Sequence, residues 1–135
     1  MKFQYNDGGR AAAGYKGATR DCVARSMAIA TQMGYEYCYD MVQTNCKDHG
    51  DGGARNGVPK KVTRAMMEVL GWEWVPTMGI GTGCKVHLRD GELPMGRLMV
   101  STSRHITAVI DGVIYDTYDP SRGGTRCVYG YWRQA

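Results

Sequence analysis

A chain of 135 residues with 43% hydrophobic and 22% charged residues has the size and composition of a single globular domain spanning residues 1–135. No apolar run approaches the length of a membrane span, and residues 1–7 lack the hydrophobic segment of a secretory signal, so we expect a cytoplasmic protein without a membrane partner. The net charge of +4 comes from basic residues interleaved with acidic ones, which is typical of a mixed, solvated surface and does not favour nucleic-acid binding.

The five cysteines do not follow the spacing of a disulfide framework or a zinc site. Their number is odd and no CxxC pair occurs, so we expect neither a disulfide framework nor a structural metal. The spacing leaves the roles of four of them open: Cys38, Cys46, Cys84 and Cys127.

Residues 1–18 are predicted to form an irregular lead-in, because glycines interrupt any hydrophobic period. Phe3 and Tyr5 are compatible with a short edge strand at its start.

A helix is predicted to begin at Cys22 or one or two residues before it, because apolar residues recur at intervals of three and four as far as Met33, and Gly34 then ends the pattern. Thr19 and Asp21 are good N-cap residues, so Cys22 is expected in the first turn. A thiolate at that position feels the positive end of the helix dipole, which favours the nucleophilic form of sulfur. The free backbone amides of the same turn can also stabilise an oxyanion.

Two interpretations of Cys22 stay open at this point. Arg20 and Arg25 add positive charge near the thiol and support a reactive cysteine, whereas Asp21 opposes them. A free cysteine on an apolar helix face is, however, most often a small buried hydrophobe.

Two more helices are expected before the chain turns to strands. Residues 35–46 carry apolar side chains on one helical side and are predicted to form an αα-hairpin with the first helix. The turn-rich loop 49–57 contains His49 but lacks the spacing of a calcium-binding loop, so no metal site is expected there. The third helix is predicted to begin near Pro59 and to end before Gly71.

Residues 77–96 are predicted to be a glycine-rich loop. The loop resembles a phosphate-binding loop superficially but lacks the Lys-Ser/Thr pair that such a loop needs. Short strands are expected just before it, over residues 72–75, and within it, over residues 85–88, where His87 is assigned a structural role.

The C-terminal part of the chain is predicted to be a sheet. Strands are expected at four places, which are residues 98–101, 105–110, 113–118 and 126–132. Because helices come first and strands follow, the sequence predicts an α+β domain in which N-terminal helices pack on a C-terminal antiparallel sheet.

The pair Asp111-Gly112 between two β-rich runs predicts a hairpin with a two-residue turn. Ile110 then pairs with Val113, and the alternation of side chains places His105, Thr107, Asp116 and Tyr118 on one face. His105 and Asp116 become diagonal neighbours within reach of a hydrogen bond. A cross-strand pair on the sheet surface is the alternative interpretation of these two residues.

A nucleophilic cysteine needs a base, and the base needs a group that fixes its orientation. Cys22, His105 and Asp116 supply these three roles. The proposed chemistry is acyl transfer, and it calls for no cofactor and no metal.

The order of these features resembles the papain-like cysteine peptidase fold, in the small form of bacteriophage-encoded relatives. His105-Ile106-Thr107-Ala108-Val109 resembles the family's His-Ala-Val segment, and Asp116-Thr117-Tyr118 stands where the family carries Asn-Ser-Trp or an Asp equivalent. The resemblance extends over most of residues 16–132. It implies a hydrolase of the peptidase or amidase type that acts on a protein or peptide-like substrate, with a host protein among the candidates.

The family carries a glutamine six residues before the nucleophile as an oxyanion donor, and Lys16 stands at that position. Lys16, Thr19 and the backbone N–H of Cys22 are therefore the oxyanion candidates. The lysine favours an alternative in which the protein is a catalytically inactive member of the fold that binds or inhibits a host partner.

Overall fold

The elements follow the predicted order, with a short edge strand at Phe3 and Tyr5, then helices, then the remaining strands. The computed structural model describes residues 1–17 and 19–135, so residue 18 of the predicted lead-in lies outside the described residues. The helices in this part of the chain are α1 (Cys22–Thr31), α2 (Tyr35–Asp48) and α3 (Lys60–Val69). The strands are β1 (Lys2–Tyr5), β2 (Trp72–Pro76), β3 (Arg97–Thr102), β4 (His105–Ile110), β5 (Val113–Asp116) and β6 (Gly130–Gln134).

The strands form one mixed sheet in the order β1-β5-β4-β3-β6-β2. All neighbouring pairs are antiparallel except β1 and β5, which run parallel. The chain is therefore an α+β protein as predicted, but the prediction of a purely antiparallel sheet is wrong. The reason is that the lead-in supplies the edge strand β1, and β5 returns beside β1 only after the helices and three other strands, a long connection that allows parallel pairing.

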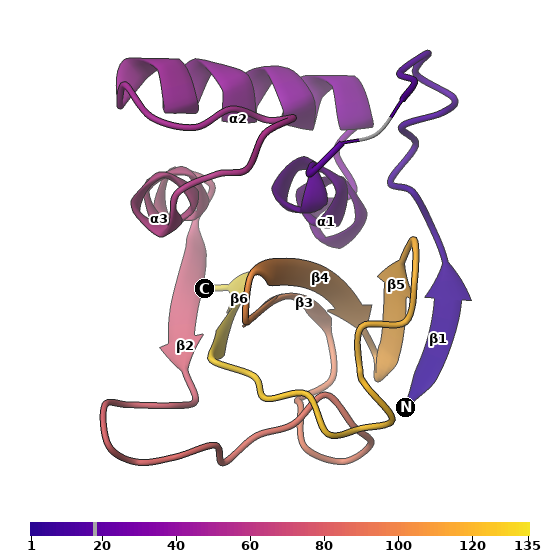
Figure 1. Cartoon of the computed structure of the whole chain (residues 1–135), viewed down its shortest axis with the longest axis vertical. Helices are drawn as coiled ribbons and strands as arrows, with labels where there is room; N and C mark the ends of the chain where they lie inside the picture. The colour runs from indigo at the N-terminus through magenta and orange to yellow at the C-terminus, as the bar shows by residue number, and fades with distance from the viewer. Residues whose placement is uncertain (18) are drawn as a thin grey trace.

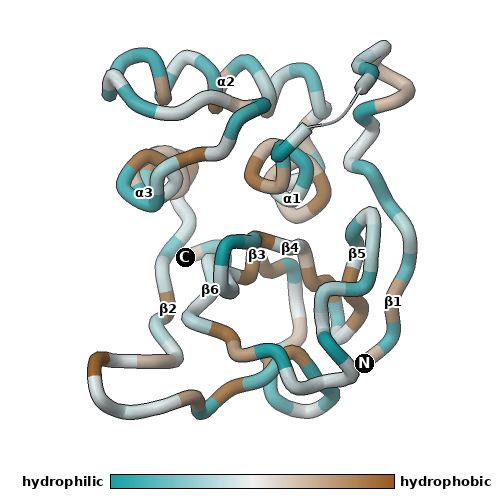
Figure 2. The backbone as a smooth tube through the Cα atoms, viewed as in Figure 1, coloured by the Kyte–Doolittle hydropathy of each residue, from teal (hydrophilic) through white to brown (hydrophobic). Residues whose placement is uncertain are grey.

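The helices cover one face of the sheet. In Figure 1, α1 and α3 are seen end-on above the strands, and α2 runs across them on the side away from the sheet. The consecutive helices α1 and α2 are in contact as predicted, with α2 crossing over α1. Figure 2 shows hydrophobic residues in α1, in α3 and in the central strands, below a largely hydrophilic α2. The core between helices and sheet includes Ala24, Met27, Val62, Met66, Met99 and Trp132.

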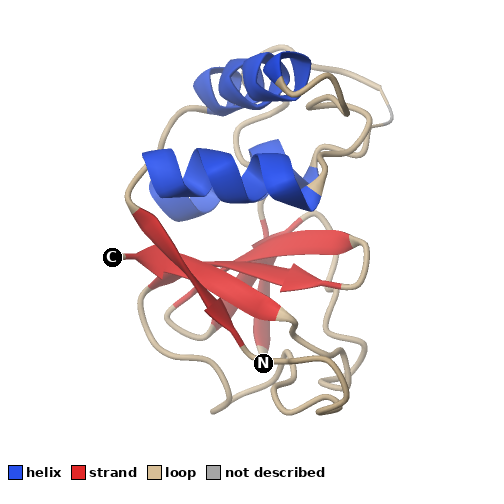
Figure 3. Cartoon of the chain, turned by 90° about the vertical axis from the view of Figure 1, so that its left-hand side faces the viewer, coloured by secondary structure: helices blue, strands red, loops and turns tan. Residues whose placement is uncertain are grey.

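The opposite face of the sheet is covered by long loops rather than by helices (Figure 3). A second apolar cluster lies there, formed by Leu88, Leu98, Val100, Val109, Ile114, Val128 and Tyr131. The predicted strand 85–88 contributes a single bridge, between His87 and Cys127, instead of a ladder. The last strand begins at Gly130, four residues later than predicted, because the residues before it bond to the loop: the N–H of Val128 donates to the carbonyl of Val86 at 2.8 Å.

A disulfide between Cys84 and Cys127 joins this loop to the segment before β6. The prediction that the cysteines form no disulfide framework is therefore wrong for Cys84 and Cys127. The two residues are 43 positions apart, so no local spacing signals the pair. Cys38 and Cys46 are buried free thiols in α2, and Cys22 is a partly buried free thiol. None of the helices in the described residues has the length and hydrophobicity needed to cross a membrane.

Candidate functional site

Cys22 is the first residue of α1, as the N-cap residues predicted. The helix begins with a hydrogen bond from the N–H of Arg25 to the carbonyl of Asp21, at 2.9 Å. Asp21 occupies the N-cap position without capping the helix through its side chain, so the first backbone N–H groups of α1 keep their positive potential. Cys22 lines a cleft of about 590 Å³, and it does so together with His105.

The hairpin between β4 and β5 has the predicted register. Ile110 pairs with Val113, and Ala108 pairs with Tyr115. The ladder between β4 and β5 ends at this pair. Beyond it, His105 Nε2 lies 2.7 Å from Asp116 Oδ2, and both side chains are buried. The turn Asp111-Gly112 thus fixes the relation between the histidine and the carboxylate.

The Asp116 carboxylate is held by hydrogen bonds on both oxygens. Thr107 Oγ1 donates to Oδ2 at 2.7 Å, and the backbone N–H of Thr117 donates to Oδ1 at 2.7 Å. Burial raises the pKa of Asp116, but the hydrogen bonds from His105 and Thr107, the charge of His105 and the backbone bond outweigh burial, so its pKa lies below the usual value. Asp116 is therefore an anion fixed in orientation beside the imidazole.

Tyr118 was predicted to pair with His105 in the ladder, but β5 ends at Asp116 and no such pair forms. The two rings nevertheless lie near each other, with centroids 5.2 Å apart. The tyrosine ring therefore flanks the imidazole.

His105 and Cys22 are electrostatically coupled. Burial raises the pKa of the Cys22 thiol, but hydrogen bonding to His105, the charge of His105, the Ile106 backbone and Arg25 together bring it below the ordinary value. Burial lowers the pKa of His105, yet its hydrogen bonds and charge interactions with Asp116 and Cys22 raise it overall. Both shifts favour a thiolate next to an imidazolium, which is the reactive state of a cysteine nucleophile.

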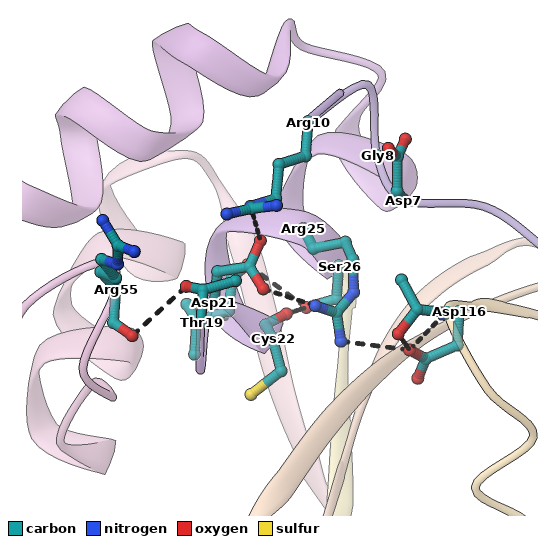
Figure 4. A network of polar contacts seen from close by, with 12 residues as sticks. Asp7, Gly8, Arg10, Thr19, Asp21, Cys22, Arg25, Ser26, Arg55 and Asp116 are labelled. Atoms are coloured by element: carbon teal, nitrogen blue, oxygen red, sulfur yellow. Dashed lines mark hydrogen bonds and ion pairs between the residues drawn. The ribbon is translucent and has the colours of Figure 1, made fainter. Parts of the chain in front are cut away.

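Arg25 connects the carboxylate of this group to the start of α1. Its Nη1 lies 2.5 Å from Asp21 Oδ1, and its Nη2 lies 3.1 Å from Asp116 Oδ1. Asp21 is fully buried and also accepts a hydrogen bond from the hydroxyl of Tyr35 at 2.6 Å. Figure 4 shows Arg25 between the two carboxylates, with Arg10 approaching Asp21 from the other side. Two buried anions therefore share one buried cation.

The ion pair between Arg25 and Asp21 was not predicted, although both residues were expected near the thiol. Their spacing of four residues at the start of a helix is a signal for an ion pair on one helical face. The bond from Arg25 to Asp116 spans 91 residues and has no local signal.

Two of the three oxyanion candidates lie outside the cleft. Lys16 is exposed, and its carbonyl accepts a hydrogen bond from Arg10 Nη2 at 2.9 Å. Thr19 Oγ1 donates to the carbonyl of Arg55 at 3.3 Å, which ties this segment to the loop before α3. Neither residue is among the described residues that line the cleft, whereas Cys22 is, so its backbone N–H is the oxyanion candidate that the structure places at the cleft.

The cleft contains polar residues that the sequence analysis did not select. Arg20 and Asn56 line it near Cys22, and both can donate hydrogen bonds to an oxygen of a bound ligand. Asn56 belongs to the turn-rich loop 49–57, and its place in the cleft follows from the packing of that loop against the segment before α1: the N–H of Arg20 donates to the carbonyl of Arg55 at 2.8 Å.

The remaining histidines lie elsewhere. His87 Nδ1 lies 3.2 Å from Glu92 Oε1, and its Nε2 lies 3.6 Å from the sulfur of Cys84, which belongs to the disulfide. His49 Nδ1 lies 2.8 Å from the carbonyl of Asn45 at the end of α2. Among residues 1–17 and 19–135, no three side chains of the His, Cys, Asp and Glu types converge as a metal ligand set.

The arrangement was compared with known proteins in three ways. No family model matches the chain. Neither the search of curated proteins nor the search of solved structures finds a significant match. In the site itself, Cys22 at the start of α1 lines one cleft with His105, and His105 contacts the Asp116 carboxylate.

Proposed function

We propose that this protein is a cysteine hydrolase with a papain-like arrangement, in which Cys22 is the nucleophile, His105 the general acid and base, and Asp116 the orienting carboxylate. The observation that carries the proposal is that Cys22 and His105 line the same cleft, where His105 lowers the pKa of the thiol, while His105 Nε2 lies 2.7 Å from Asp116 Oδ2. A papain-like arrangement is supported by the helix-borne cysteine packed on a sheet that carries the histidine and the carboxylate.

The orientation of the His105 ring suits this reaction. Its Nε2 is engaged by Asp116, which leaves Nδ1 for the sulfur of Cys22 and for the reacting groups. The fixed carboxylate stabilises the imidazolium that the proton transfer creates.

In the proposed reaction, the Cys22 thiolate attacks the carbonyl carbon of an amide and forms a C–S bond. The His105 imidazolium gives its proton to the leaving nitrogen as the C–N bond breaks. Neutral His105 then takes a proton from a water molecule whose oxygen attacks the thioester carbonyl. The C–S bond breaks, a carboxylic acid leaves, and the thiolate and imidazolium are restored. The backbone N–H of Cys22 at the helix start is the donor toward the developing oxyanion.

Capture of an acyl-enzyme tests the proposal. The protein is incubated with a panel of activated peptide esters, and the mass of the intact chain is followed with time. We expect one acyl group on Cys22 in the wild type and none in Cys22→Ala. In His105→Ala the acyl group should form and leave about 10²- to 10⁴-fold more slowly.

Cys46→Ala is the matched control, because it removes a buried thiol that lies outside the cleft. It should behave as the wild type does. Equal labelling of wild type and His105→Ala would refute the assignment of the base.

A second candidate function is a non-catalytic binding protein of the same arrangement. It is favoured by one observation, namely that Lys16 and Thr19 lie outside the cleft and that a side-chain oxyanion donor at the family position is therefore missing. Capture of a host protein in equal amounts by wild type and Cys22→Ala, without acylation of Cys22 by any ester, would support this alternative.

A further inference from the structure

The cleft that contains Cys22 is lined by basic side chains and, among the described residues, by no acidic one. Four basic residues from three parts of the chain line it, namely Arg20, Lys60, Arg64 and Arg104. No acidic side chain is among the described residues that line the cleft, and none of these four forms an ion pair with a described carboxylate. Cations collected in a concave site focus a positive potential that attracts negatively charged ligands.

Two of these cations, Lys60 and Arg64, lie over aromatic rings. Lys60 and Arg64 are four residues apart on α3 and so lie on the same helical face. The Nζ of Lys60 lies 5.3 Å from the centroid of the Tyr129 ring, and the guanidinium carbon of Arg64 lies 5.8 Å from that of Trp74. Cation–π contacts of this kind keep the charged groups at the cleft instead of in free solvent.

Trp74 and Trp132 form a large apolar wall of the cleft. The rings of Trp74 and Trp132 lie with centroids 4.4 Å apart, from neighbouring strands β2 and β6. Gly130 makes room for this arrangement, since a Cβ atom at that position would overlap the ring of Trp74. Val58 and Ile106 add aliphatic surface to the lining. An aromatic or aliphatic side chain of a ligand can bury its surface against this wall.

The other two cations border the reacting pair in the sequence. Arg20 stands two residues before Cys22, and Arg104 immediately precedes His105 in the turn between β3 and β4. Arg104 has φ of 57°, a left-handed conformation uncommon for residues other than glycine. A ligand that reacts at Cys22 therefore meets positive charge close to its reacting carbonyl.

From these observations we infer that the cleft takes an acidic peptide: a segment with Asp or Glu beside the reacting amide and a bulky apolar residue on the Trp74–Trp132 wall. The inference rests on the proposed function for the position of the reacting bond, but the binding it predicts is independent of catalysis. Carboxylates complement the four unpaired cations, and the apolar residue supplies the buried surface.

Binding is measured with Cys22→Ala, so that no turnover takes place. Three fluorescently labelled peptides share one core of apolar residues and differ only in the flanking positions, which are Glu, Gln or Lys. We expect the Glu peptide to bind about tenfold or more tightly than the Gln peptide, and the Lys peptide to bind least. The preference for Glu should shrink as salt is added.

Variants of α3 assign the preference to the cleft. In the double variant Lys60→Gln with Arg64→Gln, the Glu peptide should lose most of its advantage, while the Gln peptide binds as before. Lys61→Gln is the matched control, because Lys61 is an exposed lysine of the same helix that does not line the cleft. It removes one positive charge from the same helix without changing the lining of the cleft, and it should leave the Glu preference unchanged.

Three results would overturn the inference: equal binding of the Glu and Gln peptides, an equal loss in Lys61→Gln and in the double variant, or tighter binding of a single-stranded oligonucleotide of the same charge than of the Glu peptide. The proposed function and this inference can fail separately. Selective binding of the Glu peptide without acylation of Cys22 in the wild type would refute only the hydrolase, and acylation by uncharged peptides as fast as by acidic ones would refute only the acidic preference.

Discussion

Arg25 and Asp116 form a buried ion pair behind the candidate site, with Nη2 of Arg25 3.1 Å from Oδ1 of Asp116. The other carboxylate oxygen of Asp116 lies 2.7 Å from His105. One side of Asp116 therefore faces the base, and the other side faces a cation anchored on α1, the helix that begins with Cys22. The ion pair links the helix that carries the thiol to the strand pair that carries the histidine and its carboxylate.

Replacement of Arg25 by Met should destabilise the protein strongly, because it leaves Asp21 and Asp116 buried without their shared cation. Loss of one partner of a buried ion pair typically costs about 3–5 kcal/mol in the free energy of unfolding. Chemical denaturation measures the change. Arg25→Lys should recover part of the loss, since an ammonium cannot reach both carboxylates with the two-pronged geometry of a guanidinium.

Arg10→Met is the control for this variant. Arg10 also faces Asp21, but at 3.7 Å and from a more exposed position, so its loss should cost far less. Equal destabilisation by Arg10→Met and Arg25→Met would contradict the role given to the Arg25–Asp116 pair.

The pH dependence of alkylation should reveal the coupling between Cys22 and His105. The rate of reaction with iodoacetamide follows the thiolate fraction, so it should rise with pH through a pKa below that of a model thiol. At neutral pH Cys22 should therefore react faster than the model thiol. In His105→Ala the hydrogen bond and the charge that lower this pKa are lost while burial remains, so the curve should move to higher pH, with about a tenfold lower rate at neutral pH for each unit of movement.

Peptide mapping after alkylation supplies an internal control. Burial raises the pKa of Cys38 to about 11, so this thiol should stay unmodified in the folded protein under the same conditions. A model-thiol rate at Cys22 that is also unchanged in His105→Ala would show that the pair does not function as a nucleophile and base.

Replacement of Asp116 by Asn should lower the pKa of His105. The charge of Asp116 and its hydrogen bond to His105 are among the causes that raise this pKa, so their removal leaves burial to act in the opposite direction. The NMR titration of the His105 ring measures the change. Acylation of Cys22 should slow by about 10²-fold or more, because the imidazolium is less stable and its tautomer is no longer fixed.

Asp119→Asn is the matched control for Asp116→Asn. Asp119 is an exposed carboxylate three residues away whose Oδ1 accepts a hydrogen bond from the N–H of Ser121. The titration of His105 should be unaffected in this variant. An identical shift in both variants would indicate a general effect of net charge rather than the direct contact at Asp116.

Substitution of Gly130 by Ala should disturb the aromatic wall of the cleft. The new Cβ would overlap the Trp74 ring, which has to move, and overpacking of this kind typically costs about 1–3 kcal/mol. Thermal unfolding measures the loss, and the near-UV circular dichroism of the tryptophans reports the movement of the wall. Gly34→Ala is the control, because a Cβ at Gly34 meets open space. An unchanged tryptophan signal in Gly130→Ala would show that the glycine does not set the position of Trp74.

The local features of the site could be predicted from the chain alone. The apolar spacing and the N-cap residues predicted a helix with Cys22 in its first turn, and the helix begins at that residue. The Asp111-Gly112 turn predicted the register that places His105 beside Asp116, and the two side chains are in contact. These features depend on residues close together in the sequence, where periodicity and turn chemistry act directly.

The tertiary structure decided the relations between distant segments. The parallel pairing of β1 with β5, the Cys84–Cys127 disulfide and the bond from Arg25 to Asp116 join residues far apart in the sequence, and no local pattern encodes them. The positions of Lys16 and Thr19 outside the cleft also depend on a contact between distant segments, because the lead-in packs against the loop at Arg55. Local sequence places Cys22 at the start of a helix and His105 beside Asp116, whereas only the packing of the helices on the sheet brings Cys22 and His105 into one cleft with cations and an aromatic wall.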